Sequence, residues 1–240
     1  MNFDSETLEL LRFIVGAIYK ASVDDYSDFV QDYSYLETRN GFGLMKGNFI
    51  NNRLGELINK TNATIHSFKR YSWQGRIVID RNNKHTFSVS TQANLNTVFG
   101  KKGRHTPHYL QTVLVVQNQK CHNPHEQLTL MDTSRFDNKT YENDYRDIML
   151  SDADEFKEFT HYVIAYSISK DEIFDVELIL FDSHFDEIER TSLNNLIPFD
   201  YGELTDTPAA KSTSTTKSAR NLVALKSGIK LNLIEMDKDE

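Results

Sequence analysis

The sequence is poor in residues that cross-link a chain, break its elements or anchor it in a membrane. Among 240 residues it has one cysteine, four prolines and one tryptophan. The single Cys121 excludes an internal disulfide, which is typical of a reducing compartment. No apolar run approaches the roughly 18 residues of a membrane-spanning helix. The acidic N-terminus also lacks the basic and then apolar order of a signal peptide, so we expect a cytoplasmic protein with no membrane contact.

The rest of the composition is that of a folded domain. Hydrophobic residues make up 39% and charged residues 26% of the chain, which is too apolar for wholesale disorder. We expect a globular domain over residues 1–204. Residues 205–221 are rich in Ser, Thr, Ala and Lys and predict a flexible linker. In the following segment, 222–240, alternating apolar residues predict a strand, which either returns to the sheet or adds to a protein partner.

Hydrophobic periodicity predicts an α+β fold. Helical spacing indicates a helix over about 5–20, a second opened by a capping box at Ser22, and a third capped by Asn48. Further helices are expected around 95–99 and 141–149. The sequence thus favours a single domain with N-terminal and interspersed helices around a largely antiparallel or mixed sheet.

Strands are predicted where the apolar period falls to two. Residues 63–72 are expected to be extended, 76–90 to form a β-hairpin with one apolar face, and 161–182 to form a second hairpin. The unbroken run Val113–Val116 predicts a strand over 109–117 that is buried on both faces. A short strand is expected at 128–131.

Charge is divided unevenly along the chain. Residues 39–120 contain thirteen basic and two acidic side chains, whereas residues 132–206 contain twenty acidic and six basic ones. Such asymmetry is a recognised indicator of polyanion binding. Basic side chains contact phosphates, and interleaved aromatic rings stack on unpaired bases. The predicted nucleic-acid contacts are Lys69, Arg70, Arg76, Lys101, Lys102 and Arg104, with Trp73 or Tyr71 as the stacking ring.

The same charge pattern is compatible with two alternatives. The basic and acidic segments can face each other across one fold and neutralise each other. Alternatively, the acidic surface of 132–206 or the C-terminal segment binds a protein, as an inhibitor that mimics nucleic acid would.

Element order suggests one enzyme alternative. From residue 48 to 117 the predicted order is helix, three strands, helix, strand, which matches the core of restriction-endonuclease-like proteins. A nuclease of that kind holds Mg²⁺ with strand carboxylates. Here Asp80 and the helix-borne Glu56 are the available acids, and the third strand, Thr86–Ser90, carries neither an acid nor a lysine. We therefore expect no catalysis and no cofactor, with a Mg²⁺-dependent nuclease as the alternative.

Histidines and Cys121 have the two-residue spacing of zinc ligands. His105 and His108 form one pair, and Cys121, His122 and His125 form another group. A strand over 109–117 would hold the two groups about 30 Å apart, so we expect no metal site.

Several short motifs resemble an uncharacterised bacterial and phage-encoded domain family. They are Phe68-Lys69-Arg70-x-x-Trp73, a hairpin through Asp80, His108-Tyr109-Leu110 and His161-Tyr162-Val163-Ile164. The resemblance covers residues 5–200 and implies a prokaryotic or phage context, without an activity or catalytic positions. Together these patterns predict a non-catalytic regulatory or accessory protein that contacts nucleic acid, in phage defence or counter-defence.

Overall fold

Six strands form one mixed sheet. The computed structural model describes residues 1, 3–56, 61–70, 72–100, 105–121, 136–169 and 172–198. The strands follow one another in the order β1-β2-β3-β4-β5-β6, and all neighbours are antiparallel except the central pair, β3 and β4. Their bounds are β1 Thr64–Arg70, β2 Trp73–Asp80, β3 His85–Thr91, β4 Thr160–Ser169, β5 Glu172–Phe181 and β6 Glu187–Ser192.

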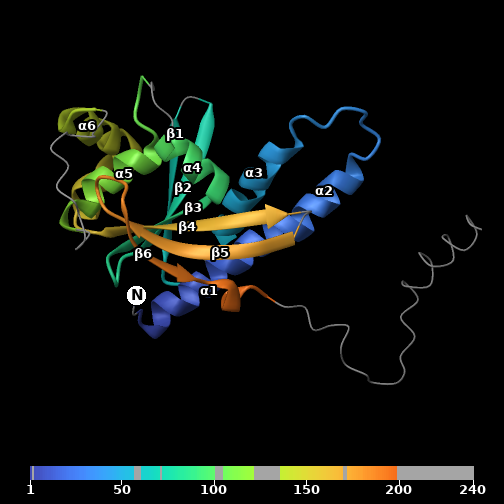
Figure 1. Ribbon diagram of the computed structural model, residues 1–240, viewed down its shortest axis with the longest axis horizontal. Coiled ribbons are helices and arrows are strands. Elements are labelled where there is room, and N and C mark those ends of the chain that lie inside the picture. The colour runs from blue at the N-terminus through green and yellow to red at the C-terminus, as the bar shows by residue number, and fades with distance from the viewer. Residues whose placement is uncertain are drawn as a thin grey trace, which may run out of the picture. The chain divides into compact units, whose positions relative to one another are not determined.

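Helices cover both faces of this sheet (Figure 1). Three precede the first strand: α1 Ser5–Lys20, α2 Tyr26–Asp32 and α3 Phe42–Gly55. The others lie between β3 and β4: α4 Gln92–Gly100, α5 Tyr109–Gln117, α6 Asn138–Met149 and α7 Ala153–Phe156. Short turns of helix occur at Ala21–Asp25, Asn118–Lys120, Leu150–Asp152 and Asn194–Leu196. None of the described helices is long and apolar enough to cross a membrane.

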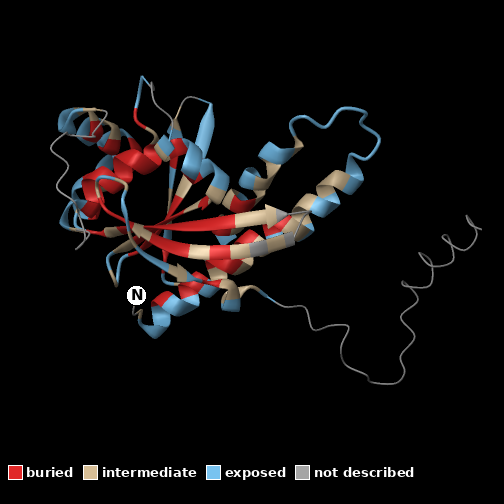
Figure 2. Cartoon of the chain, in the orientation of Figure 1, coloured by how far each residue is buried: buried red, intermediate tan, exposed pale blue. Residues whose placement is uncertain are grey.

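The alternation of β2 and β3 explains why both sheet faces are covered. Ile77 and Ile79 point into a core shared with α5 and α6, whereas Val78 and Phe87 point into a second core shared with α1 and α3. Successive strand residues face opposite sides, so apolar residues at every position of 77–79 require a layer on each face. Figure 2 shows α5 and the central strands buried and the connection between α2 and α3 exposed.

The prediction of a strand over 109–117 was wrong, because these residues form α5. Every one of the nine residues is buried, so the helix has no polar face from which a period could be read. His108 begins the helix with a capping box: its side chain accepts from the backbone, and Gln111 Oε1 accepts from the His108 amide at 3.0 Å. A buried strand and a buried helix can both be nine residues long, so the length of this apolar segment did not distinguish the two.

The N-terminal helices also differ from expectation. The predicted capping box at Ser22 was wrong: α1 ends at Lys20 as expected, but a π-helical turn, Ala21–Asp25, joins it to α2, and Ser22 is buried within that turn. The third helix begins at Phe42, six residues before the predicted cap at Asn48. The sixth strand, Glu187–Ser192, was not predicted, because its side chains are mostly exposed and carry no apolar alternation.

The predicted endonuclease-like order of elements was wrong in its last element, because the strand predicted over 109–117 is the helix α5. From α3 to β4 the order still reads helix, three strands, helices, strand, with the final strand parallel to the third. Residues Met1–Pro198 form one compact unit. The predicted strand at 128–131, the linker 205–221 and the segment 222–240 lie outside the described residues.

Candidate functional site

A groove runs between α3 and the start of β2. A cavity of ≈ 820 Å³ is lined by α3, β1, β2 and the end of α6, including Lys69 and Arg76. It shares Asn48, Asn51 and Arg76 with a cavity of ≈ 310 Å³ beneath α3, which Trp73 also lines. The shared residues make the two cavities neighbours, and we call the two together the α3 groove. Of the sequence-predicted site residues, Lys69 and Arg76 therefore line the larger cavity, and Trp73 and Arg76 line the smaller one.

Aromatic rings form one wall of the α3 groove. The Trp73 ring centroid lies 5.1 Å from that of Tyr109 and 5.6 Å from that of Phe68. Trp73 remains 46% exposed, so its ring can contact a ligand, whereas Phe68 and Tyr109 are buried. Burial raises the pKa of the Tyr109 hydroxyl, which stays protonated. A Cβ on Gly75 would lie 2.5 Å from the Trp73 ring, which is too close. The ring can pack against the backbone of β2 here because residue 75 has no side chain.

Two basic side chains, Lys69 and Arg76, line the α3 groove, and a third, Lys46, lies on α3 outside the lining of its two cavities. Lys69 on β1 is exposed. Arg76 on β2 donates from Nη1 to the carbonyl of Asn51, near the end of α3, where the helix dipole favours a cation. Lys46 on α3 lies with its Nζ 4.0 Å from the centre of the Tyr26 ring. Arg76 thus joins helix to sheet, and Lys69 presents its charge to solvent.

Arg70 was predicted to contact nucleic acid, but its guanidinium instead forms a mostly buried ion pair with Asp144. Its guanidinium donates to Asp144 Oδ1 at 2.6 Å and to the Pro107 carbonyl at 2.9 Å. The pair is mostly buried, with 18% and 16% of the two side chains exposed. Thr112 Oγ1 donates to the other Asp144 oxygen. Predicted contacts Lys101, Lys102 and Arg104, and the alternative stacking residue Tyr71, lie outside the described residues.

Part of the charge asymmetry is neutralised by ion pairs between the basic and the acidic segments. Basic residues of 39–120 pair with acids of 132–206 around α6 and α7. These ion pairs are Arg70–Asp144, Arg81–Glu155 and Lys120–Glu158. Intramolecular compensation, one of the alternatives expected from the sequence, therefore operates around α6 and α7.

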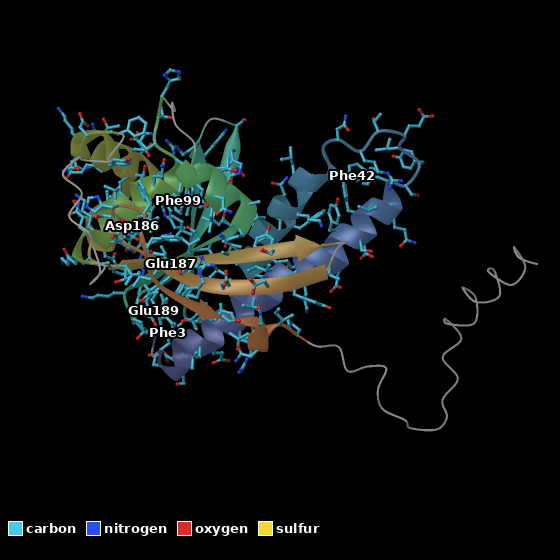
Figure 3. The ribbon with its side chains drawn as sticks, viewed as in Figure 1. Phe3, Phe42, Phe99, Asp186, Glu187 and Glu189 are labelled. Atoms are coloured by element: carbon cyan, nitrogen blue, oxygen red, sulfur yellow. The ribbon has the colours of Figure 1, made fainter. Side chains whose placement is uncertain are left out.

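The acids near β6 also have partners. Arg190 contacts both Glu187 and Glu177, and the N-terminal amine donates to Glu189. Figure 3 shows Glu187 and Glu189 at β6, far from Phe42 at the start of α3. These acids at β6 therefore lie away from the start of α3, whereas Asp147 of the acidic segment lines the α3 groove.

Asp80 and Glu56, the candidate nuclease acids, occupy different structural roles. Asp80 lies at the end of β2 and accepts from Thr7 Oγ1 at 3.1 Å and from Asn83 Nδ2 at 3.0 Å. It therefore joins α1 to the β2–β3 turn. Glu56 forms an ion pair with Arg53 in the last turn of α3. Among the described residues, no three His, Cys, Asp or Glu are grouped to hold a metal ion.

The two groups of potential zinc ligands are closer together than a strand over 109–117 would place them. With these residues helical, the rise is about 1.5 Å per residue instead of 3.3 Å, which shortens the path from His108 to Cys121. His122 and His125 lie outside the described residues. Burial raises the pKa of the Cys121 thiol, which favours the protonated form over a metal-binding thiolate.

Comparison with known proteins places the chain in a family. Residues 4–238 match the family of unknown function DUF5986. The chain belongs to this family. The match confirms the resemblance to an uncharacterised domain family and extends past the residues 5–200 expected from the motifs. No curated protein and no solved structure matches the chain.

A buried polar network in this DUF5986 member was not predicted from the sequence. Thr86 Oγ1 on β3 donates to Gln117 Oε1 at 2.6 Å and lies 2.8 Å from His161 Nδ1 on β4. Gln117 Nε2 in turn donates to the Tyr145 hydroxyl at 2.9 Å. Complete burial lowers the pKa of His161 to about 3, so the ring is neutral. The network joins α5 and α6 to the sheet and is structural.

The carboxamides of the α3 groove were also not predicted as site residues. Asn48, Asn51 and Asn52 lie three and four residues apart, which is the spacing of one helix face. That spacing is visible in the sequence. The prediction of a helix cap at Asn48 placed this residue at the start of the helix and so concealed the face to which it belongs.

Proposed function

We propose that this protein binds single-stranded nucleic acid in the α3 groove, as a non-catalytic regulatory or accessory protein. The observation that carries the proposal is that Arg76 lines both cavities of the α3 groove, with Lys69 in the larger one and the exposed Trp73 in the smaller one. They lie on the two neighbouring strands β1 and β2, and the sequence predicts that each contacts a phosphate or stacks on a base.

The chemistry of the groove suits a strand with unpaired bases. Lys69 and Arg76 provide positive charge for phosphates, which release counterions on binding. The exposed Trp73 ring offers a stacking face, worth about 1–3 kcal/mol per base, that a paired base inside a duplex cannot use. Asn48 and Asn52 add paired donors and acceptors that match the polar edges of bases.

Further features set the biological context of the proposal. The groove has one carboxylate among the described residues lining its larger cavity, Asp147, which gives no basis for metal-assisted hydrolysis. The lone Cys121 is consistent with a cytoplasmic location. A role in phage defence or counter-defence stays a prediction that the resemblance suggested.

Trp73 makes the proposal directly measurable, because it is the only tryptophan of the chain. Titration of the full chain with poly-deoxythymidine and poly-uridine oligonucleotides should quench its fluorescence as bases stack on the ring. A duplex of the same length should quench much less. Unchanged fluorescence together with no binding of any single strand by calorimetry would overturn the proposal.

A charge variant and a matched control test the location of the site. Lys69→Gln should weaken oligonucleotide binding several-fold, since one phosphate contact is lost. Lys84→Gln removes the same charge from the β2–β3 turn, at the opposite end of these strands, and should bind as the wild type does. Equal loss in both variants would show that binding follows net charge and not the α3 groove.

A further inference from the structure

The α3 groove continues into a larger lobe. This cavity of ≈ 900 Å³ lies at the carboxyl ends of β3 and β4 and shares Trp73, Tyr109 and Tyr166 with the space beneath α3. We call it the β3/β4 lobe. β3 and β4 are the parallel pair of the sheet. In open sheets with helices on both faces, ligands bind outside the carboxyl ends of parallel strands, where connections leave in different directions.

The walls of the lobe offer two kinds of contact. One wall is aromatic: Trp73 and Tyr109 lie with their ring planes 31° apart, and Trp73 is the exposed ring. The lobe is also lined by polar residues from the junction of β3 and α4. There the Asn94 side chain donates from Nδ2 to Ser90 Oγ at 2.9 Å, and the Asn94 backbone N–H donates to Thr91 Oγ1 at 3.1 Å. These bonds fix the Asn94 carboxamide at the edge of the lobe.

The charge of the lobe favours an anion. Lys46 is the basic side chain among the described residues that line it, and none of those residues is an aspartate or glutamate. An aromatic face, an oriented carboxamide with hydroxyls and a basic side chain correspond to the three parts of a nucleotide: base, sugar and phosphate.

We propose that the β3/β4 lobe binds one nucleotide that carries a phosphate monoester, with its base on Trp73 and its phosphate toward Lys46. The inference rests on the proposed function, because the lobe opens from the same groove. The nucleotide is either the phosphorylated end of a bound strand or a free mononucleotide. Both sources have the same chemistry, and the experiment separates them.

Gly47 allows the lobe to be blocked without damage to the fold. It lies inside α3 and lines the lobe, and a Cβ built on it meets nothing within 4 Å. Gly47→Phe should therefore place a ring in the cavity while the helix is retained. Gly47→Ala is the matched control, because it removes the glycine and leaves the cavity open.

The test uses calorimetric titration of the full chain with AMP, GMP, CMP and UMP, with adenosine, and with decamers bearing a 5′-phosphate or a 5′-hydroxyl. A mononucleotide should bind, or the 5′-phosphorylated decamer should bind at least five-fold more tightly than its hydroxyl counterpart. The first result identifies a free nucleotide as the ligand and the second a strand end. Gly47→Phe should reduce that affinity at least ten-fold, Gly47→Ala should not, and adenosine should bind more weakly than AMP.

Two results would overturn the lobe assignment. One is no mononucleotide binding together with equal affinity for both decamers. The other is a Gly47→Phe variant, folded by circular dichroism, that binds as the wild type does. If Lys69→Gln still weakens decamer binding in either case, the lobe assignment fails and the α3 groove stands. If no decamer binds at all, the proposed function itself fails.

Discussion

Lys69 and Arg70 are neighbours in the sequence with opposite surroundings. Strand residues alternate between faces, so Lys69 is exposed at the α3 groove while Arg70 reaches Asp144 on α6. The sequence marks both as cations and does not say which has an acidic partner, because Asp144 is 74 residues away. For a single basic residue, only its tertiary contacts show whether the side chain is available to a ligand or held in a structural ion pair.

The two neighbours should therefore respond differently to the same substitution. Arg70→Gln should lower the free energy of unfolding by about 2–4 kcal/mol, because Asp144 is left mostly buried without its partner. Lys69→Gln should change it by less than about 0.5 kcal/mol. Urea unfolding followed by circular dichroism measures both. Equal stability of the two variants would contradict the assignment of Arg70 to the core.

His161 is a fully buried titratable group on β4. Its pKa is lowered by burial to about 3, against about 6.5 in the unfolded chain. Between these values the unfolded state binds the proton and the folded state does not, so the stabilising contribution is present above pH 6.5 and is lost as pH falls. No group among the described residues accepts a hydrogen bond from His161 Nε2, so none would stabilise a proton on that nitrogen.

The pH dependence of stability should reflect this group. Between pH 6 and 4, His161 should contribute a slope of about 1.4 kcal/mol per pH unit to the free energy of unfolding. His161→Gln should be less stable at pH 7, because Thr86 loses a partner, and should have a slope shallower by about that amount. Urea unfolding at several pH values provides the comparison. Identical slopes for the two proteins would show that His161 titrates normally in the folded state.

At the scale of elements, strands were predicted better than helices. Alternation located both hairpins, because one residue in two of β2 to β5 packs on each core. The buried helix α5 and the continuous α1–α2 path were not predictable from local pattern. The first has no polar face, and the second depends on packing that buries Ser22 where a cap was expected. The fold class was therefore accessible from sequence, whereas the nature of its most buried segment was not.

Glycine has opposite effects in α3 and in β2. Gly47→Ala should raise the free energy of unfolding by about 0.5–1 kcal/mol, because the added methyl has open space and alanine favours helix. Gly75→Ala should lower it and shift the Trp73 emission, since the new Cβ would lie within 2.7 Å of both the Trp73 and Phe68 rings. Thermal unfolding and fluorescence spectra measure these effects. A stabilising Gly75→Ala would contradict the packing of the aromatic wall.

At the scale of the whole molecule, the uneven charge has two outcomes. On the α6 and α7 side, basic and acidic residues neutralise each other across the fold. On the α3 side, Lys69 and Arg76 line a groove with an exposed aromatic ring. The sequence located the basic segment correctly but did not separate these sides, because pairing depends on which helix covers which face of the sheet.

The salt dependence of binding tests the central claim most directly. For a single strand, the slope of log affinity against log salt is about −0.7 for each phosphate neutralised. With Lys69 and Arg76 in the α3 groove and Lys46 in the β3/β4 lobe, the wild type should have a slope of about −2. Lys69→Gln should make it shallower by about 0.7, and Lys84→Gln should leave it unchanged. A flat slope for the wild type, or equal changes in the two variants, would contradict binding of nucleic acid in the α3 groove.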